Sequence, residues 1–522
     1  MLLWLGLSLW QIGAYPLTDG NAEARGILLG FRLASGIDDP VALGAPFLSG
    51  AAPLSYLLTV VGAHMLPAGE FMWRLPYALV GAIQMPVLLL LAERFFGRRA
   101  AAFAGMLLIG SGLFAINRLA TGASVFMTLE LIGAIFLLRY MDDGVRRWLV
   151  FSALAFAAAA LTVSAGVTML LAAVGIAWFV RRNRRDVVIA GFTGLGLVIG
   201  YFVIAEMISA IYSNMALSEL PGMSGGAASR FGIHVGGFFD SWIVYVGVPV
   251  FALVLVGIAE AVIHRYERRT VLFAVLGLVV AFAIPALVVG PVEEHPILIL
   301  PLLLVIAGYG WSQVTRQLQS VATQGMIAMA VVSIAMAGVV WQQAVFNPAN
   351  QFTDALSGLR EYALSLEHGP GVFEDDGYGI QAVAQVLREE TEQGDRIFVR
   401  DGVSAAAISL YAARSAEPMN FDDFNGGAAF LDGAFLVIRG EDETFNGGLN
   451  GAITVVANHR VFVDEKVLYQ VVEFASSGEP FSTPVWWRAE PQIKQFTNEH
   501  TDFRDFLTPL HTADSTDQQP AG

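Results

Sequence analysis

Long apolar stretches recur through the first 344 residues, and they limit how this chain can fold more than any other feature. Eleven such stretches stand out between residues 1 and 344. A helix needs about 20 apolar residues to cross the hydrocarbon core, where its backbone groups must satisfy one another. The pattern therefore predicts transmembrane helices over 1–13, 74–93, 100–117, 122–138, 147–162, 165–180, 187–208, 241–263, 270–289, 296–312 and 325–344.

The composition agrees with an integral membrane protein. Hydrophobic residues make up 55% of the chain and charged residues 14%, with a mean hydropathy of +0.60. Soluble proteins carry about 25% charged residues. The net charge of -15 is unevenly spread and forms no basic footprint for nucleic acid. The chain has no cysteine, which excludes disulfides, thiolate metal ligands and cysteine nucleophiles.

Arginines in the short loops indicate the orientation of the helices. Every second loop is basic, as expected if those loops face the cytoplasm. The arginines are Arg94, Arg98 and Arg99, then Arg139, Arg146 and Arg147, then Arg181, Arg182, Arg184 and Arg185, then Arg265, Arg268 and Arg269. The apolar stretch 53–66 is too short to cross, so we interpret it as re-entrant or interfacial. The first loop, 14–73, and the C-terminal region are then extracytoplasmic.

The C-terminal region has the composition of a soluble domain. Helices are predicted over 379–391 and 404–412, and strands over 396–400, 435–439, 453–457, 460–463 and 467–474. This mixture predicts a small α/β domain over 346–510, followed by a disordered tail over 511–522. The expected fold class is an α-helical polytopic membrane protein of about eleven transmembrane helices, over 1–345, with a C-terminal extracytoplasmic α/β domain.

Ionisable residues near the outer membrane surface are the candidates for chemistry, because no Walker motif, metalloprotease helix or nucleophile elbow occurs. Asp19 and Glu23 open the long first loop, and a carboxylate there could act as a general base. Arg74, Arg118 and His295 could hold a lipid phosphate. The alternative is that such charges only anchor loops at the interface, which is the commoner role for any single one.

Glu130 lies near the middle of the predicted span 122–138. A charge there costs at least about 3 kcal/mol on insertion scales. Two interpretations stay open: the carboxyl lines a polar cavity, or it is protonated and hydrogen-bonded to a neighbouring helix.

The order of several short motifs resembles the family 39 GT-C glycosyltransferases, the membrane group that contains protein O-mannosyltransferases and the lipid A aminoarabinose transferase. Ala22-Glu23-Ala24-Arg25 resembles the family's D-E-A-R, and Ala52-Pro53-Leu54-Ser55-Tyr56 resembles its P-P-L-x-Y. Arg74-Leu75-Pro76 opens the second span, Phe95-Phe96-Gly97-Arg98-Arg99 is similar to the basic turn after it, and His295-Pro296 with Leu300-Pro301 is similar to its R-Y-x-L-P segment.

The resemblance implies a GT-C fold and transfer of a sugar from a polyprenyl phosphate to an external protein, lipid or glycan. No cofactor is expected and no metal-binding residue is assigned, while metal dependence stays open. It also implies that Asp19 or Glu23 acts as the acceptor base, and that Arg74, Arg118, His295 and Tyr56 bind substrate. The chain departs from the family at Ala22, where the family has its Asp, and in 118–124, which lacks the second acid. The family's lysine and the arginine of R-Y-x-L-P are missing as well.

Three functions follow from these observations. The first is a polyprenyl-phosphate-dependent glycosyltransferase. The second is a GT-C-like subunit that has lost catalysis and binds other membrane proteins, which the missing acids favour. The third is a transporter or flippase, suggested by Glu130 and the span count, although the chain lacks the matched halves common in transporters.

Overall fold

The structure is a computed structural model, and it describes most of the helices and strands of the chain. The described ranges are 1–10, 69–163, 165–181, 183–212, 245–264, 266–289, 295–316, 320–336, 376–392, 394–400, 405–414, 416–419, 432–440, 454–463, 466–475 and 484–488, with 12, 23, 24, 26–28, 54, 58, 59, 61, 242 and 403.

The chain divides into two compact units. The helical unit comprises Met1–Ile12, Asp39–Leu58 and Arg74–Pro370. The sheet unit comprises Gly13–Asp38, Thr59–Trp73 and Gly371–Gly522, and so joins two pieces of the first loop to the C-terminal domain.

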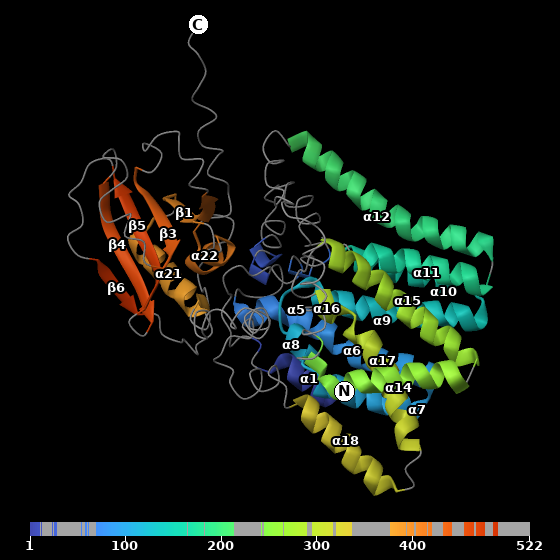
Figure 1. Cartoon of the computed structure of the whole chain (residues 1–522). Helices are drawn as coiled ribbons and strands as arrows, with labels where there is room; N and C mark the ends of the chain where they lie inside the picture. Colours follow the sequence, from blue (N-terminus) through green and yellow to red (C-terminus); the bar gives the residue numbers. More distant parts are fainter. Residues whose placement is uncertain are drawn as a thin grey trace. The chain divides into compact units, whose positions relative to one another are not determined.

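Helices fill the helical unit, and a helix occupies at least part of every predicted apolar stretch (Figure 1). They are α1 (Leu2–Leu9), α5 (Glu70–Ala82), α6 (Gln84–Phe96), α7 (Arg98–Gly110), α8 (Leu113–Ile116), α9 (Gly122–Asp143), α10 (Arg146–Ala160), α11 (Gly166–Arg181), α12 (Arg184–Tyr212), α14 (Val248–His264), α15 (Tyr266–Val289), α16 (His295–Leu298), α17 (Leu300–Arg316) and α18 (Val321–Met336).

Two of the described helical segments are long and apolar enough to cross a membrane. They are Glu70–Phe96, with a hydropathy of 1.9, and Gly122–Asp143, with a hydropathy of 1.6. Shorter apolar helices include Gly166–Arg181, Val248–Ile263, Arg269–Pro285 and Thr323–Ile334. The mostly helical architecture is therefore confirmed, while the number of crossings stays a prediction.

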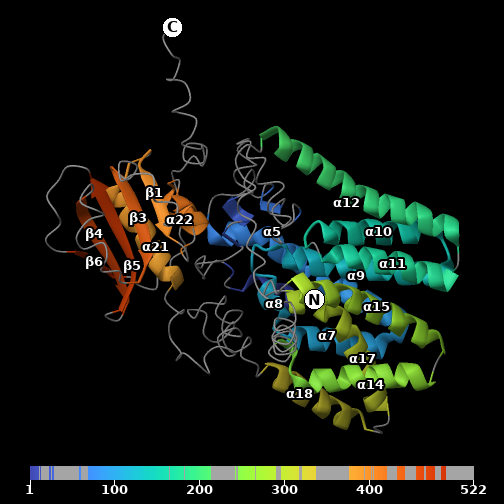
Figure 2. The same cartoon turned by 45° about the horizontal axis from the view of Figure 1, so that its top comes forward.

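Small residues let neighbouring helices approach closely. A Cβ added at Gly133 of α9 would lie 2.9 Å from the ring of Phe156 on α10, and the Ser152 hydroxyl of α10 donates to the Gly133 carbonyl at 2.9 Å. Helices α9 to α12 lie side by side in both Figure 1 and Figure 2. Such small-residue contacts are the usual means of packing helices in a membrane, because the hydrophobic effect does not drive helices together within lipid.

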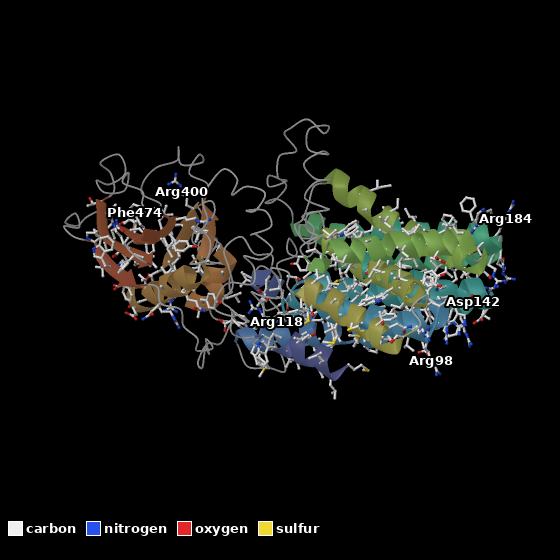
Figure 3. All side chains as sticks on the ribbon, turned by 60° about the horizontal axis from the view of Figure 1, so that its bottom comes forward. Arg98, Arg118, Asp142, Arg184, Arg400 and Phe474 are labelled. Carbon is white, nitrogen blue, oxygen red and sulfur yellow. The ribbon has the colours of Figure 1, made fainter. Side chains whose placement is uncertain are left out.

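Charged side chains gather at one end of the helical unit. Figure 3 shows Arg98, Asp142 and Arg184 at this end and Arg118 at the opposite end. Arg94 pairs with Asp142 at 3.5 Å, and the buried Asp186 accepts from Arg146 at 2.8 Å. This is the end that the arginine pattern predicts to be cytoplasmic, and we call it the basic end.

A mixed six-stranded sheet forms the centre of the sheet unit (Figure 2). Its order is β2-β1-β3-β5-β4-β6. The strands are β1 (Arg396–Arg400), β2 (Ala416–Met419), β3 (Ala434–Arg439), β4 (Thr454–Val463), β5 (Lys466–Ala475) and β6 (Val485–Arg488). Helix α21 (Asp376–Glu390) packs against β4 and β5, and α22 (Ala405–Ala412) connects β1 to β2 and packs against α21. The core consists of buried apolar residues of the central strands and of α21 and α22.

The secondary structure predicted for this domain is largely confirmed. Both helices are present, and the predicted strand 396–400 coincides with β1. The strands predicted over 453–457 and 460–463 are two parts of one continuous strand, β4, which has a register irregularity between Val455 and Ala457. Strands β2 and β6 were not predicted from the sequence. The predicted tail, 511–522, lies outside the described residues.

Candidate functional site

The connection between α7 and α9 lies at the end of the helical unit opposite the basic end, and it is buried throughout. Every residue from Ser111 to Thr121 is shielded from solvent, including Arg118 at 2% exposure. The predicted continuous helix over 100–117 is wrong, because α7 ends at Gly110 and only the four-residue α8 follows. Non-helical backbone is tolerated at membrane depth where protein surrounds it.

Two amide side chains join this connection to the start of α6. Gln84 of α6 donates to the Asn117 carbonyl oxygen at 2.9 Å, and Asn117 donates back to Gln84 at 3.1 Å. Gln84 also donates to the Ser124 carbonyl at 3.3 Å. The reciprocal pair satisfies both amides without any net charge, which suits a buried position.

Gly81 provides the space and the acceptor for this arrangement. Its carbonyl accepts from the indole of Trp4 at 3.1 Å and from Asn117 at 3.5 Å. A Cβ at Gly81 would clash with the Asn117 side chain. Glycine is therefore required here for close packing of α5, α1 and the residue before Arg118.

The two candidate arginines of the helical unit are both buried. Arg74 is 1% exposed and donates to the Ile12 carbonyl at 3.1 Å. It lies seven residues before Gly81 on α5, or about 10 Å along the helix axis. Arg118 directly follows Asn117. A buried guanidinium requires hydrogen-bond or ionic partners.

Part of the first loop is described, and its residues 23, 24 and 26–28 belong to the sheet unit, whereas Leu54 and Leu58 belong to the helical unit. Glu23 is fully buried, and Ala24, Ile27 and Leu28 are buried as well. Asp19 and Tyr56 lie outside the described residues. The candidate carboxylate Glu23 and the arginines thus fall in different units, and the roles of all these residues remain predictions.

His295 opens the short helix α16, next to α17, and its side chain is outside the described part. Glu130 is fully buried in α9, and neither of its carboxyl oxygens has a hydrogen-bond partner among the described residues. The hydrogen bond to a neighbouring helix that one interpretation required is therefore not formed there. Within the described residues, no three His, Cys, Asp or Glu side chains come together as a metal site would require.

His459, a residue that the pattern analysis did not single out, has a structural role in the sheet unit. Its Nδ1 accepts from the Trp487 indole at 3.2 Å, and burial lowers the pKa of His459, although the nearby Glu390 opposes that shift. The neutral imidazole preserves the acceptor, so this histidine links β4 to β6.

The comparisons with known proteins identify the group to which this arrangement is similar. Residues 51–209 match the family described as dolichyl-phosphate-mannose-protein mannosyltransferase. The resemblance to the family 39 GT-C glycosyltransferases is confirmed. The matched segment contains Arg74, Gln84, Asn117 and Arg118. No curated protein sequence matches the chain.

Solved structures of GT-C glycosyltransferases share the fold of the chain. ArnT from Cupriavidus metallidurans bound to undecaprenyl phosphate has a TM-score of 0.59 at 16% identity, covering 90% of this chain and 97% of ArnT. Its apo state gives 0.58 at 16% identity, over 90% and 95%. AglB from Archaeoglobus fulgidus, in complex with an inhibitory peptide and a dolichol-phosphate, gives 0.50 at 12% identity over 84% and 68%. At these identities the comparison shows the GT-C fold.

The amide pair was not predicted from the sequence, although both polar residues are visible in the apolar stretches. Gln84 interrupts the apolar stretch 74–93, and Asn117 ends the stretch 100–117. A polar residue inside a predicted span marks a helix contact or a cavity. Nothing in the pattern shows that these two, 33 residues apart, would meet.

Proposed function

We propose that this chain is a membrane glycosyltransferase that moves a sugar from a polyprenyl phosphate to an acceptor outside the membrane. The match of residues 51–209 to a mannosyltransferase family carries the proposal. The GT-C fold supports it, since ArnT with the same fold was solved with undecaprenyl phosphate and AglB with a dolichol-phosphate. The acceptor class stays open among protein, lipid and glycan.

The reaction requires one base and one anion site. A hydroxyl or amine of the acceptor attacks the anomeric carbon and forms the new glycosidic bond. The bond from that carbon to the phosphate oxygen breaks, and the polyprenyl phosphate leaves with the electron pair. A carboxylate takes the acceptor proton, and cationic side chains stabilise the charge that develops on the phosphate.

We assign the base to Asp19 or Glu23 and the phosphate contacts to Arg74, Arg118 and His295, with Tyr56 beside the substrate. The burial of both arginines supports this assignment, because a phosphate is the type of group that a buried guanidinium binds in bidentate fashion. The amide pair behind Arg118 would then hold its backbone in place.

Transfer assays on the purified full-length protein test the proposal. A panel of undecaprenyl-phosphate-linked sugars serves as donors, and native mass spectrometry measures binding of undecaprenyl phosphate. We expect Asp19→Asn or Glu23→Gln to abolish transfer while leaving lipid binding intact, because only the proton acceptor is lost. Arg118→Lys should weaken lipid binding by about tenfold, because an ammonium group cannot form the two parallel hydrogen bonds that a guanidinium donates to a phosphate.

Glu392→Gln is the matched control, because it removes an exposed carboxylate of the sheet unit. Normal turnover in both first-loop variants would contradict the assignment of the base. Failure of the wild-type protein to bind undecaprenyl phosphate would contradict the proposed donor, and would favour the non-catalytic subunit instead.

A further inference from the structure

Two arginines share one tryptophan at the basic end of the helical unit. The Cζ atom of Arg139, on the last turns of α9, lies 4.7 Å from the centre of the Trp148 ring. The Cζ atom of Arg147, on the first turn of α10, lies 4.8 Å from the same ring. We call Arg139, Arg147 and Trp148 the arginine–tryptophan cluster. It holds two like charges on a single indole.

The acidic side chains near this end are paired with other arginines. The pairs are Arg94 with Asp142 at 3.5 Å and with Asp143 at 3.8 Å, Arg98 with Glu93 at 3.1 Å, and Arg146 with Asp186 at 2.8 Å. Within the described residues, neither Arg139 nor Arg147 has an acidic partner. Among the described residues no ion pair offsets the repulsion between these two guanidinium groups, and an external anion would relieve it.

Apolar rings adjoin the cluster. Phe136 stacks on Trp148 with centroids 5.7 Å apart, and Phe151 meets Trp148 edge-on at 6.1 Å. Phe151 is exposed, as is Arg147, while Arg139 and Trp148 are partly exposed. Tryptophan and arginine at helix ends are typical of the membrane interface. The surface thus joins a cationic part to an aromatic part, as does the boundary between lipid headgroups and acyl chains.

We propose that the arginine–tryptophan cluster binds the phosphate of an anionic phospholipid, with the acyl chains against Phe136 and Phe151. Two guanidinium groups can donate several charge-assisted hydrogen bonds to one phosphate, and basic sites between transmembrane helices hold such headgroups in other membrane proteins. The bound lipid bridges the end of α9 and the start of α10. The proposal uses no residue of the catalytic assignment and does not depend on it.

The test uses the full-length protein, stripped of lipid in a neutral detergent and titrated with phosphatidylglycerol or phosphatidylcholine. Native mass spectrometry measures the bound lipid. We expect a clear preference for phosphatidylglycerol and a loss of affinity on the order of tenfold or more in the Arg139→Gln/Arg147→Gln variant. Arg98→Gln/Arg99→Gln removes the same charge from α7 at the same end and should leave the tight binding unchanged.

Three results would overturn the proposal. Equal losses of phosphatidylglycerol affinity in the two double variants would show that only the overall positive charge matters. Equal binding of the two lipids would show that the site does not prefer an anionic headgroup. Inorganic phosphate that binds as tightly as phosphatidylglycerol would assign the site to a free anion. Arg147→Lys keeps the charge and the folded protein but loses the fork, so it should bind phosphatidylglycerol more weakly than the wild type.

Discussion

At the scale of single residues, the pairing of Gln84 with Asn117 holds the candidate site together without charge. Each amide donates to the other inside a fully buried region. Gln84→Leu or Asn117→Leu alone should destabilise the protein by about 1 to 3 kcal/mol, because each removes the partner amide's hydrogen bonds within the pair. The double variant should cost clearly less than the sum, because it leaves no orphaned amide. Thermal unfolding in detergent measures all three variants, and additive effects would contradict the pairing.

Residue type alone could predict only part of the candidate site. Arg74 and Arg118 stand out in sequence because a charge near an apolar stretch demands a partner, and both are buried in the structure. The need for glycine at Gly81 could not be predicted, since it arises from the approach of the Asn117 side chain. Contacts between residues far apart in sequence depend on tertiary packing, which hydrophobic periodicity does not reveal.

At the scale of elements, α17 depends on its small residues. A Cβ at Gly310 would clash with the Leu253 carbonyl oxygen of α14. Gly310→Ala should therefore force the two backbones apart and lower stability by about 1 to 3 kcal/mol. Gly175→Ala in α11 is the control, because a Cβ there meets nothing within 4 Å. The midpoint of thermal unfolding should fall for Gly310→Ala only, and equal midpoints would contradict this close packing.

Hydropathy predicted where the helices lie but not where every one ends. The error at α7 arose because Leu113 to Ile116 are apolar yet buried by protein, and hydropathy does not distinguish protein from lipid as the surroundings. In β4, the polar pair Asn458 and His459 suggested a break between two strands, but both are buried within one strand. Strand β2 contains Pro418 and lies at the sheet edge, where proline is tolerated and the pattern is weak.

At the scale of the whole molecule, the absence of cysteine allows a direct test of the predicted topology. The single substitutions Ser320→Cys, between α17 and α18, and Glu392→Cys, in the sheet unit, each introduce one labelling site. No other cysteine of the chain can react. The predicted order of spans places position 320 in the cytoplasm and position 392 outside. In intact cells, a membrane-impermeant maleimide should therefore label Glu392→Cys at once, and Ser320→Cys only after lysis.

The same experiment separates the two interpretations of the apolar stretch 53–66. If this stretch is re-entrant, the arginine-rich loops stay cytoplasmic, and Asn183→Cys, between α11 and α12, should be protected in intact cells. If it crossed the membrane fully, every later loop would change sides, because each crossing reverses the orientation of the chain after it. Asn183→Cys and Ser320→Cys would then be labelled in intact cells and Glu392→Cys protected. That outcome would place the sheet unit in the cytoplasm and the arginine-rich loops outside, which contradicts the positive-inside rule.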